Sequence, residues 1–165
     1  MDPDLKRCVE GLTAAIAAFG HADPDRSRAG KWSIAQVLEH LDLTYTRNAA
    51  AAVRRIAKGE APSHRRSVRQ IVARLLVVRL GHFPTGRKSP EGVVPKGRPF
   101  ADVAPHLESH LRELDARLND AERAFGSTKA ILDHPVMGPF SVSDWRRFHW
   151  VHTRHHLRQL GQGDV

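Results

Sequence analysis

The stretch "SIAQVLEHLDLTYTRNAAAAVRRIAKG", residues 33–59, has one helical pattern from end to end. Ser33 is followed three residues later by Gln36, which is the spacing of a capping box. Gly59 is suited to end the helix. Between these limits, apolar residues recur every three or four positions, as on one buried helix face: Ile34, Leu38, Leu41, Tyr45, Ala52 and Ile56. The stretch therefore predicts a long amphipathic helix.

Four further stretches show the same helical periodicity. They are residues 3–19, residues 67–80, residues 102–125, where Asp102 is the expected N-cap, and residues 141–160, which begin with Ser141. Residues 67–80 are nearly all apolar, so we expect that helix to be buried on most sides.

Two connecting stretches lack this periodicity. Residues 81–100 contain four Gly and four Pro, which predicts a long loop without regular structure, and residues 126–140 predict a turn-rich connection. No stretch alternates as a half-buried strand does. We therefore expect an all-α fold, an up-and-down four-helix bundle with one additional short helix and a long Gly/Pro-rich loop, as a single domain over residues 1–165.

The composition narrows the class of protein. Hydrophobic residues make up 41% of the chain, which is typical of a soluble protein. The densest apolar run, residues 71–80, is short and contains Arg74 and Arg79, and the first residues lack a signal-peptide pattern. Cys8 is the only cysteine, which excludes an intrachain disulfide, and we expect it to be a small core residue. These features favour a cytoplasmic protein without membrane contact.

Histidines gather near the end of the chain in "HWVHTRHHLRQL", residues 149–160. At 100° per residue, His149, His152 and His156 fall on the face that also carries the apolar aromatic residues of this helix, and His155 lies at its edge. Unpaired buried imidazoles cost roughly 1–3 kcal/mol each, so they need partners. The i, i+4 pair His152 and His156 could share one divalent ion.

A third ligand would have to come from another helix. His40 borders the apolar face of residues 33–59, where it can reach a site between two helices. The residues thus leave two interpretations open: a metal site made of His40, His152 and His156, or histidines that hydrogen-bond among themselves in a non-catalytic helical protein. A metal bound by three imidazoles keeps at least one position open, as in catalytic sites, and Zn, Ni, Mn and Fe are all candidates.

Several other side chains are candidates for a supporting role. His149, His155 and Gln159 could act next to the metal, as acid, base or orienting group, although hydrogen bonding within the core explains His149 slightly better. Tyr45 and Trp145 could line a cavity or pack in the core. Glu39 and Asp42 do not align with His40 on the helical wheel, so we expect them on the surface.

Two motifs in this chain resemble one known family. "KWSIAQVLEHLDLT" at residues 31–44 and "VHTRHHLRQL" at residues 151–160 resemble the two histidine motifs of the DinB/YfiT-like metalloprotein superfamily, in the same order. "HPVMGPFSVSDWRRF" at residues 134–148 is similar to the approach to the last helix in an uncharacterised branch of it. The chain departs from many members in reading "HHLRQ", where they have His-His-Arg-Gly-Gln.

The resemblance implies a four-helix bundle in which His40, His152 and His156 hold one divalent metal ion, while His155 matches an extra histidine that is not usually a ligand. Some members are thiol-dependent S-transferases that use a low-molecular-weight thiol. We therefore expect a metal-dependent enzyme acting on a small molecule, of S-transferase or hydrolase type, with a homodimer as a candidate assembly.

The positive charge of the chain is local. Between Lys58 and Arg98 there are ten Lys or Arg and two Glu, so this segment accounts for the whole net charge of +8. We expect four of its residues to guide a small anionic substrate toward the metal, namely Arg87, Lys88, Lys96 and Arg98. A nucleic-acid-binding module is the alternative, but no recognisable nucleic-acid motif accompanies the charge. A solvated surface without a partner is the third interpretation.

Overall fold

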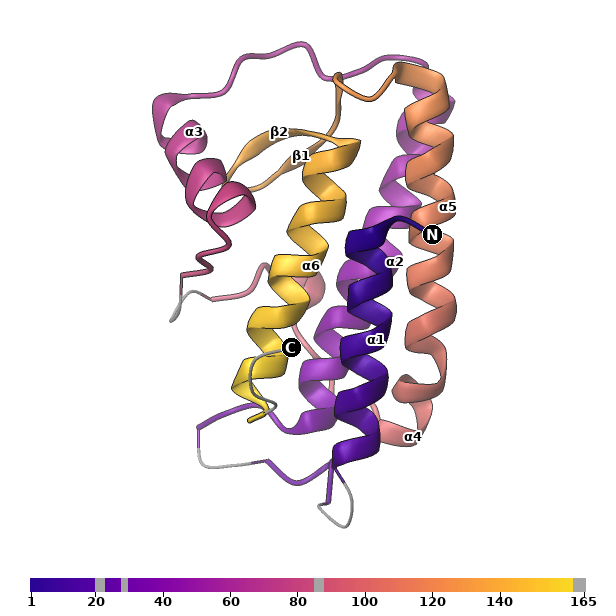
Figure 1. Cartoon of the computed structure of the whole chain (residues 1–165), viewed down its shortest axis with the longest axis vertical. Coiled ribbons are helices and arrows are strands. Elements are labelled where there is room, and N and C mark those ends of the chain that lie inside the picture. Colours follow the sequence, from indigo (N-terminus) through magenta and orange to yellow (C-terminus); the bar gives the residue numbers. More distant parts are fainter. Residues whose placement is uncertain (20–22, 28–29, 85–87, 162–165) are drawn as a thin grey trace.

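The computed structural model describes residues 1–19, 23–27, 30–84 and 88–161. Four long helices in this part lie side by side (Figure 1), with α2 packed mainly on α5 and α1 mainly on α6. Their bounds are α1 Pro3–Ala18, α2 Ile34–Lys58, α5 Leu107–Phe125 and α6 Val142–Gln159. Their inward faces form one core whose largest fully buried side chains include Leu5, Leu38, Leu111 and Leu157.

The helix ends follow from local hydrogen bonding. At the start of α2, the Ser33 hydroxyl accepts from the backbone N–H of Gln36, and the side-chain oxygen of Gln36 accepts from the backbone N–H of Ser33. The predicted capping box is therefore confirmed. Gly59 ends α2 with a φ of 69°, a conformation that a residue with a Cβ rarely adopts. Ser141 and Asp144 form the same reciprocal pair at the start of α6.

The all-α prediction is wrong. Strands β1 (Ala130–His134) and β2 (Gly138–Ser141) form a two-stranded antiparallel sheet in the connection between α5 and α6, with Leu132 opposite Phe140. All four residues of β2 are buried, so its side chains do not alternate between core and solvent as the expected strand pattern requires. The sheet lies beside the start of α6 and α3 (Figure 1).

The prediction of a bundle with one extra short helix is also wrong, because several short elements accompany the long helices. They are α3 (Val68–Arg74), the π-helical turn η1 (Leu75–Arg79), η2 (Glu91–Val93), α4 (Phe100–Val103) and η3 (Ala104–His106). Residues 81–100 thus contain a 3₁₀ turn rather than only irregular chain, and Asp102 lies inside α4 instead of capping a helix.

The helix predicted at residues 67–80 forms as α3 and η1, but it is not buried on most sides. Only Val77 and Val78 of this segment are buried, while Val68 and Leu80 are 77% and 67% exposed. The helix turns its polar residue Arg74 toward α6, where it pairs with Asp144. No helix among the described residues combines the length and hydropathy needed to cross a membrane.

Candidate metal centre

Three histidines from two helices meet between α2 and α6. Nε2 of His152 lies 3.2 Å from Nε2 of His40 and 3.1 Å from Nε2 of His156. One ring nitrogen from each residue lies within 4.8 Å of the other two, and all three residues are buried. The i, i+4 spacing on α6 brings His152 and His156 together, and the packing of α2 against α6 adds His40.

The ring orientations of two of these histidines are set by acceptors outside the cluster. Nδ1 of His40 lies 2.6 Å from the carbonyl oxygen of Val93, and Nδ1 of His156 lies 2.9 Å from Oε1 of Gln159. An acceptor at Nδ1 holds the proton there and leaves the Nε2 lone pair free to bind a metal. Both lone pairs are therefore directed at the ring of His152.

His152 completes an arrangement that calls for a cation. Its Nδ1 is buried and has no hydrogen-bond partner among the described residues. If Nε2 of His152 carried a proton, it could donate a good hydrogen bond to only one of the two neighbouring Nε2 lone pairs. The lone pair of the other histidine would then have no donor. A single divalent ion between the three nitrogens satisfies all of them at once.

Burial keeps these imidazoles neutral. It lowers the pKa of His40, with partial compensation from the Val93 hydrogen bond, and lowers the pKa of His156 to about 3, with a further contribution from nearby His40. The pKa of His152 is lowered well below its ordinary value, first by burial and then by the charges that its neighbours would carry. Neutral imidazole is the form that binds metals.

Two of the three separations between the ring nitrogens are close to those of a first coordination sphere. Metal–nitrogen bonds of ~2.0–2.1 Å at tetrahedral angles separate neighbouring ligand nitrogens by ~3.3–3.4 Å. The Nε2 separations of 3.2 Å and 3.1 Å require only small adjustments to reach this value. Three neutral nitrogen donors suit Zn²⁺ and the other first-row divalent ions that prefer imidazole.

Aromatic rings surround the triad. The Trp32 ring centroid lies 5.1 Å from that of His40 and 6.4 Å from that of His156. The Phe148 ring stacks on His152 at 5.3 Å, and the Phe83 ring lies 5.2 Å from His152. These apolar walls limit the access of water to the triad and strengthen electrostatic interactions there.

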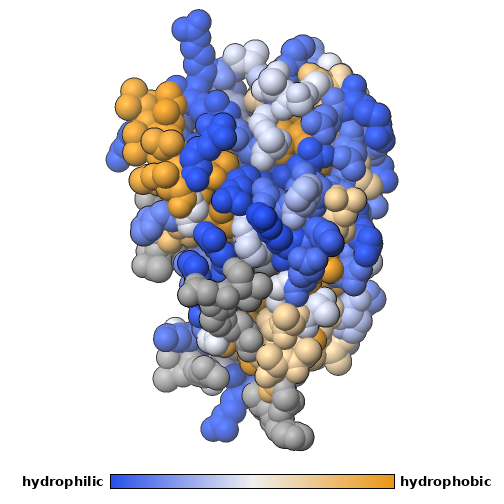
Figure 2. Space-filling model, viewed as in Figure 1, coloured by the Kyte–Doolittle hydropathy of each residue, from blue (hydrophilic) through white to orange (hydrophobic). Residues whose placement is uncertain are grey.

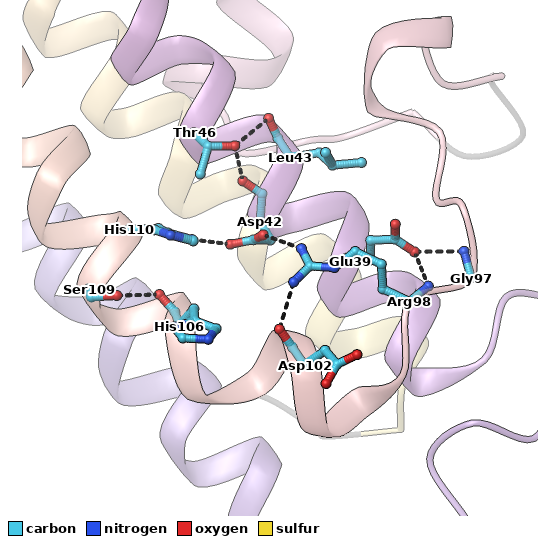
Figure 3. A network of polar contacts seen from close by, with 10 residues as sticks. All are labelled: Glu39, Asp42, Leu43, Thr46, Gly97, Arg98, Asp102, His106, Ser109 and His110. Carbon is cyan, nitrogen blue, oxygen red and sulfur yellow. Dashed lines mark hydrogen bonds and ion pairs between the residues drawn. The ribbon is translucent and has the colours of Figure 1, made fainter.

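The expectation that Glu39 and Asp42 are surface residues is wrong. They are 1% and 4% exposed, and they hold the segment after η2 against α2 (Figure 3). Oε2 of Glu39 accepts from the backbone N–H groups of Gly97 and Arg98, and Asp42 accepts from His110 at 2.5 Å. This network positions the chain that carries the Val93 carbonyl against His40.

The remaining predicted positions of α2 and α6 lie around the triad or behind it. Gln159 joins His156 to His155, whose Nε2 lies 2.9 Å from Nε2 of the amide. His149 is completely buried one turn away, with Nε2 3.2 Å from Asn48, and burial lowers its pKa to about 3. It lies within the core beside Tyr45, whose ring centroid is 5.5 Å away.

Tyr45 and Trp145 are core residues. The Tyr45 hydroxyl lies 2.6 Å from that of Thr153, which satisfies both groups, and burial raises the Tyr45 pKa well above its ordinary value. Trp145 packs edge-on against Phe140 and Phe148 at the start of α6. Among the described ring contacts, neither residue touches a triad histidine directly, although Trp145 contacts Phe148, which stacks on His152.

The basic residues proposed to guide an anion differ in their surroundings. Arg98 binds Asp42 at 3.4 Å and the Asp102 carbonyl at 2.7 Å, whereas Lys88 and Lys96 are exposed. Arg87 lies outside the described residues. The guidance of an anionic ligand stays a prediction, although the Arg98 guanidinium already has two protein acceptors.

Cys8 lies in the core of α1 rather than at the triad. Its side chain is fully buried, its thiol donates to the Asp4 carbonyl, and burial raises its pKa to about 12. A thiol with such a pKa is protonated at neutral pH, which makes it a poor nucleophile.

Some contributors to the centre carry little or no signal in the sequence. Val93 acts through its backbone carbonyl, so its side-chain type does not indicate the role. Trp32 precedes α2, and Phe83 follows η1. Their positions beside the triad depend on how the segments before α2 and after η1 pack. An aromatic residue next to the helix of His40 is the weak signal that could have indicated Trp32.

Comparison with known proteins yields one family. The model of the family described as "Protein of unknown function (DUF1569)" matches residues 5–162, which is nearly the whole chain and includes every residue of the triad. No curated protein and no solved structure matches the chain.

Proposed function

This chain belongs to the family described as "Protein of unknown function (DUF1569)", and we propose that it binds one divalent metal ion through His40, His152 and His156. The observation that carries the proposal is the convergence of three buried Nε2 atoms, of which two have their lone pairs directed inward by acceptors at Nδ1. Such second contacts are typical of histidines that ligate metals.

We further propose that the metal takes part in a reaction on a small molecule. Three protein ligands leave a coordination position for water or a thiolate, whose pKa a bound divalent ion lowers. The chain's own contribution is to keep three imidazoles neutral, to orient them, and to surround them with Trp32 and Phe83. Hydrolysis and thiol-dependent S-transfer are the two reaction types that this chemistry supports.

The resemblance to the DinB/YfiT-like superfamily supports the thiol-dependent alternative. It rests on residues 31–44 and 151–160, and the structure brings together the three histidines that the resemblance implied as ligands. The low-molecular-weight thiol would come from solution, because the Cys8 thiol is buried in the core with a pKa raised to about 12.

Nucleic-acid binding receives less support from the basic segment than its charge suggested. Arg66 and Arg74 lie against buried Asp144, and Arg98 binds buried Asp42. Part of the local positive charge is thus balanced by acidic residues inside the protein.

Metal analysis of untagged protein, after incubation with Zn²⁺ and removal of excess ion, tests the proposal. We expect close to one ion per chain, near-complete loss in His152→Ala and His156→Ala, and a sharp reduction in His40→Ala. His64→Ala is the control, because this histidine is 58% exposed and lies outside the triad.

Circular dichroism of each variant separates loss of metal from loss of fold. If the folded wild-type chain holds no metal after reconstitution, or if a folded His152→Ala/His156→Ala variant still holds a full equivalent, the proposal is wrong. Assays of hydrolysis and thiol transfer with and without the metal would then separate the two reaction types.

A further inference from the structure

The helical segment of α3 and η1 turns its apolar side outward. Figure 2 shows a hydrophobic patch at the upper left of the molecule, where Figure 1 places α3. Six large apolar residues between positions 68 and 80 are between 42% and 77% exposed: Val68, Ile71, Val72, Leu75, Leu76 and Leu80. Together they form a continuous face on the order of 500 Å², at the upper end of what a soluble monomer exposes.

This outward orientation is held by polar contacts on the opposite side of the same helix. Arg74 donates from Nε and Nη2 to the two carboxylate oxygens of Asp144, at 2.9 Å and 2.5 Å. The side chain of Gln70 lies so close to Gly138 that a Cβ there would be 2.9 Å from it. Turning the apolar face inward would move Arg74 away from Asp144 and leave this buried carboxylate with only the Arg66 guanidinium, 3.6 Å away.

Positively charged side chains lie within the apolar face and next to it. Arg65, Arg69 and Arg79 are exposed, and none of them has an acidic side chain within 4 Å among the residues that the structure describes. On the helical wheel Arg79 lies within the apolar arc and Arg69 at its edge. A partner for this face must therefore offer apolar material surrounded by negative charge.

We propose that the face of α3 and η1 docks on an anionic lipid surface. An interfacial helix inserts its apolar side chains at the boundary of headgroups and acyl chains, while Lys or Arg at its border contact anionic headgroups. The sequence-based expectation of no membrane contact rests on the lack of a membrane-spanning run and of a signal-peptide pattern, and an interfacial helix needs neither.

A second copy of the chain fits this face less well. A two-fold axis through the face would place its arginines near the same arginines of the other copy, which is unfavourable. The face also offers less than the ~800 Å² per partner of a stable protein interface. A lipid surface supplies the opposite charge and imposes no minimum area.

The docking face continues into one wall of the candidate metal centre. Gly81 follows η1, and its carbonyl accepts from Arg154 on α6. Phe83 then places its ring beside His152 and His155. Docking does not involve the histidines themselves, so metal-free protein should bind lipid as the metal-loaded protein does.

Vesicle co-sedimentation tests the proposal. We expect the full chain to bind vesicles of phosphatidylcholine with about one-third phosphatidylglycerol, and to bind pure phosphatidylcholine much more weakly. Leu75→Ser/Leu80→Ser should weaken binding roughly tenfold or more, because both residues are at least half exposed and lose apolar contact with the lipid. Arg69→Gln and Arg79→Gln should each weaken it roughly fivefold.

Val53→Ser is the matched control, because Val53 is 47% exposed on α2, away from this face, and its replacement should leave binding unchanged. Light scattering on the same samples reports the oligomeric state. Equal binding to both vesicle types, or no loss in Leu75→Ser/Leu80→Ser, would overturn the proposal. A dimer in solution that this double substitution dissociates would also overturn it and assign the face to a second copy.

Discussion

Asp144→Asn is expected to destabilise the protein strongly. The Asp144 carboxylate is 5% exposed and receives two hydrogen bonds from Arg74, while the Arg66 guanidinium lies 3.6 Å away. It also accepts from the Ser141 N–H in the capping box of α6. Asparagine keeps the shape and can keep the capping bond, but it removes the charge between two guanidinium groups.

The magnitude follows from the burial of the partners. Removing one side of a buried ion pair costs about 3–5 kcal/mol. The side chains of Arg74 and Arg66 are 23% and 29% exposed, so water partly replaces the lost contact. We therefore expect the free energy of unfolding to fall by about 2–4 kcal/mol, and the melting temperature by roughly 5–15 °C in a domain of this size.

Urea denaturation followed by circular dichroism measures this change. Asp133→Asn is the matched control, because Asp133 and its partner His64 are 43% and 58% exposed and should contribute less than about 1 kcal/mol. Combining Asp144→Asn with Arg74→Met should cost less than the sum of the two single changes. The reasoning is refuted if Asp144→Asn and Asp133→Asn have the same effect, or if the two changes at the pair simply add.

Three further results are expected. Gln159→Ala should weaken Zn²⁺ binding about 10–100-fold in a chelator competition, because it removes the acceptor that orients His156. An unchanged affinity would show that the Gln159 amide has no such role. The free energy of unfolding of metal-free protein should fall as pH decreases from about 6.5 to about 4. In the folded protein, burial lowers the pKa of His134 to about 4 and that of His149 to about 3, whereas the unfolded chain protonates both histidines over this range. Each contributes about 1.4 kcal/mol per pH unit, and a flat profile in urea titrations over this range would contradict the assignment. Cys8→Ala should leave any thiol-transfer or hydrolytic activity largely intact while chelation abolishes it, and the reverse pattern would transfer the chemistry from the metal to Cys8.

Predictions from the sequence were most accurate where the determining contacts are local. The capping boxes at Ser33 and Ser141 join residues three positions apart, and the left-handed end of α2 needs only Gly59. The shared face of His152 and His156 follows in the same way from the helical repeat. The long helices and the pair of His152 and His156 could therefore be recognised from local geometry, and the place of His40 at the border of an apolar helix face indicates it as the third candidate.

Tertiary structure alone decided the features that depend on distant partners. The sheet of β1 and β2 escaped prediction because both strands are short, β2 is buried throughout, and burial along β1 does not alternate strictly. The outward face of α3 depends on Asp144, which lies 70 positions after Arg74, and the burial of Asp42 depends on Arg98 and His110. His40 joins the triad only through the packing of α2 against α6, and Val93 enters through a backbone carbonyl. Local propensity determines which residues share a helix face, whereas long-range pairing of charges and polar groups determines which way that face points.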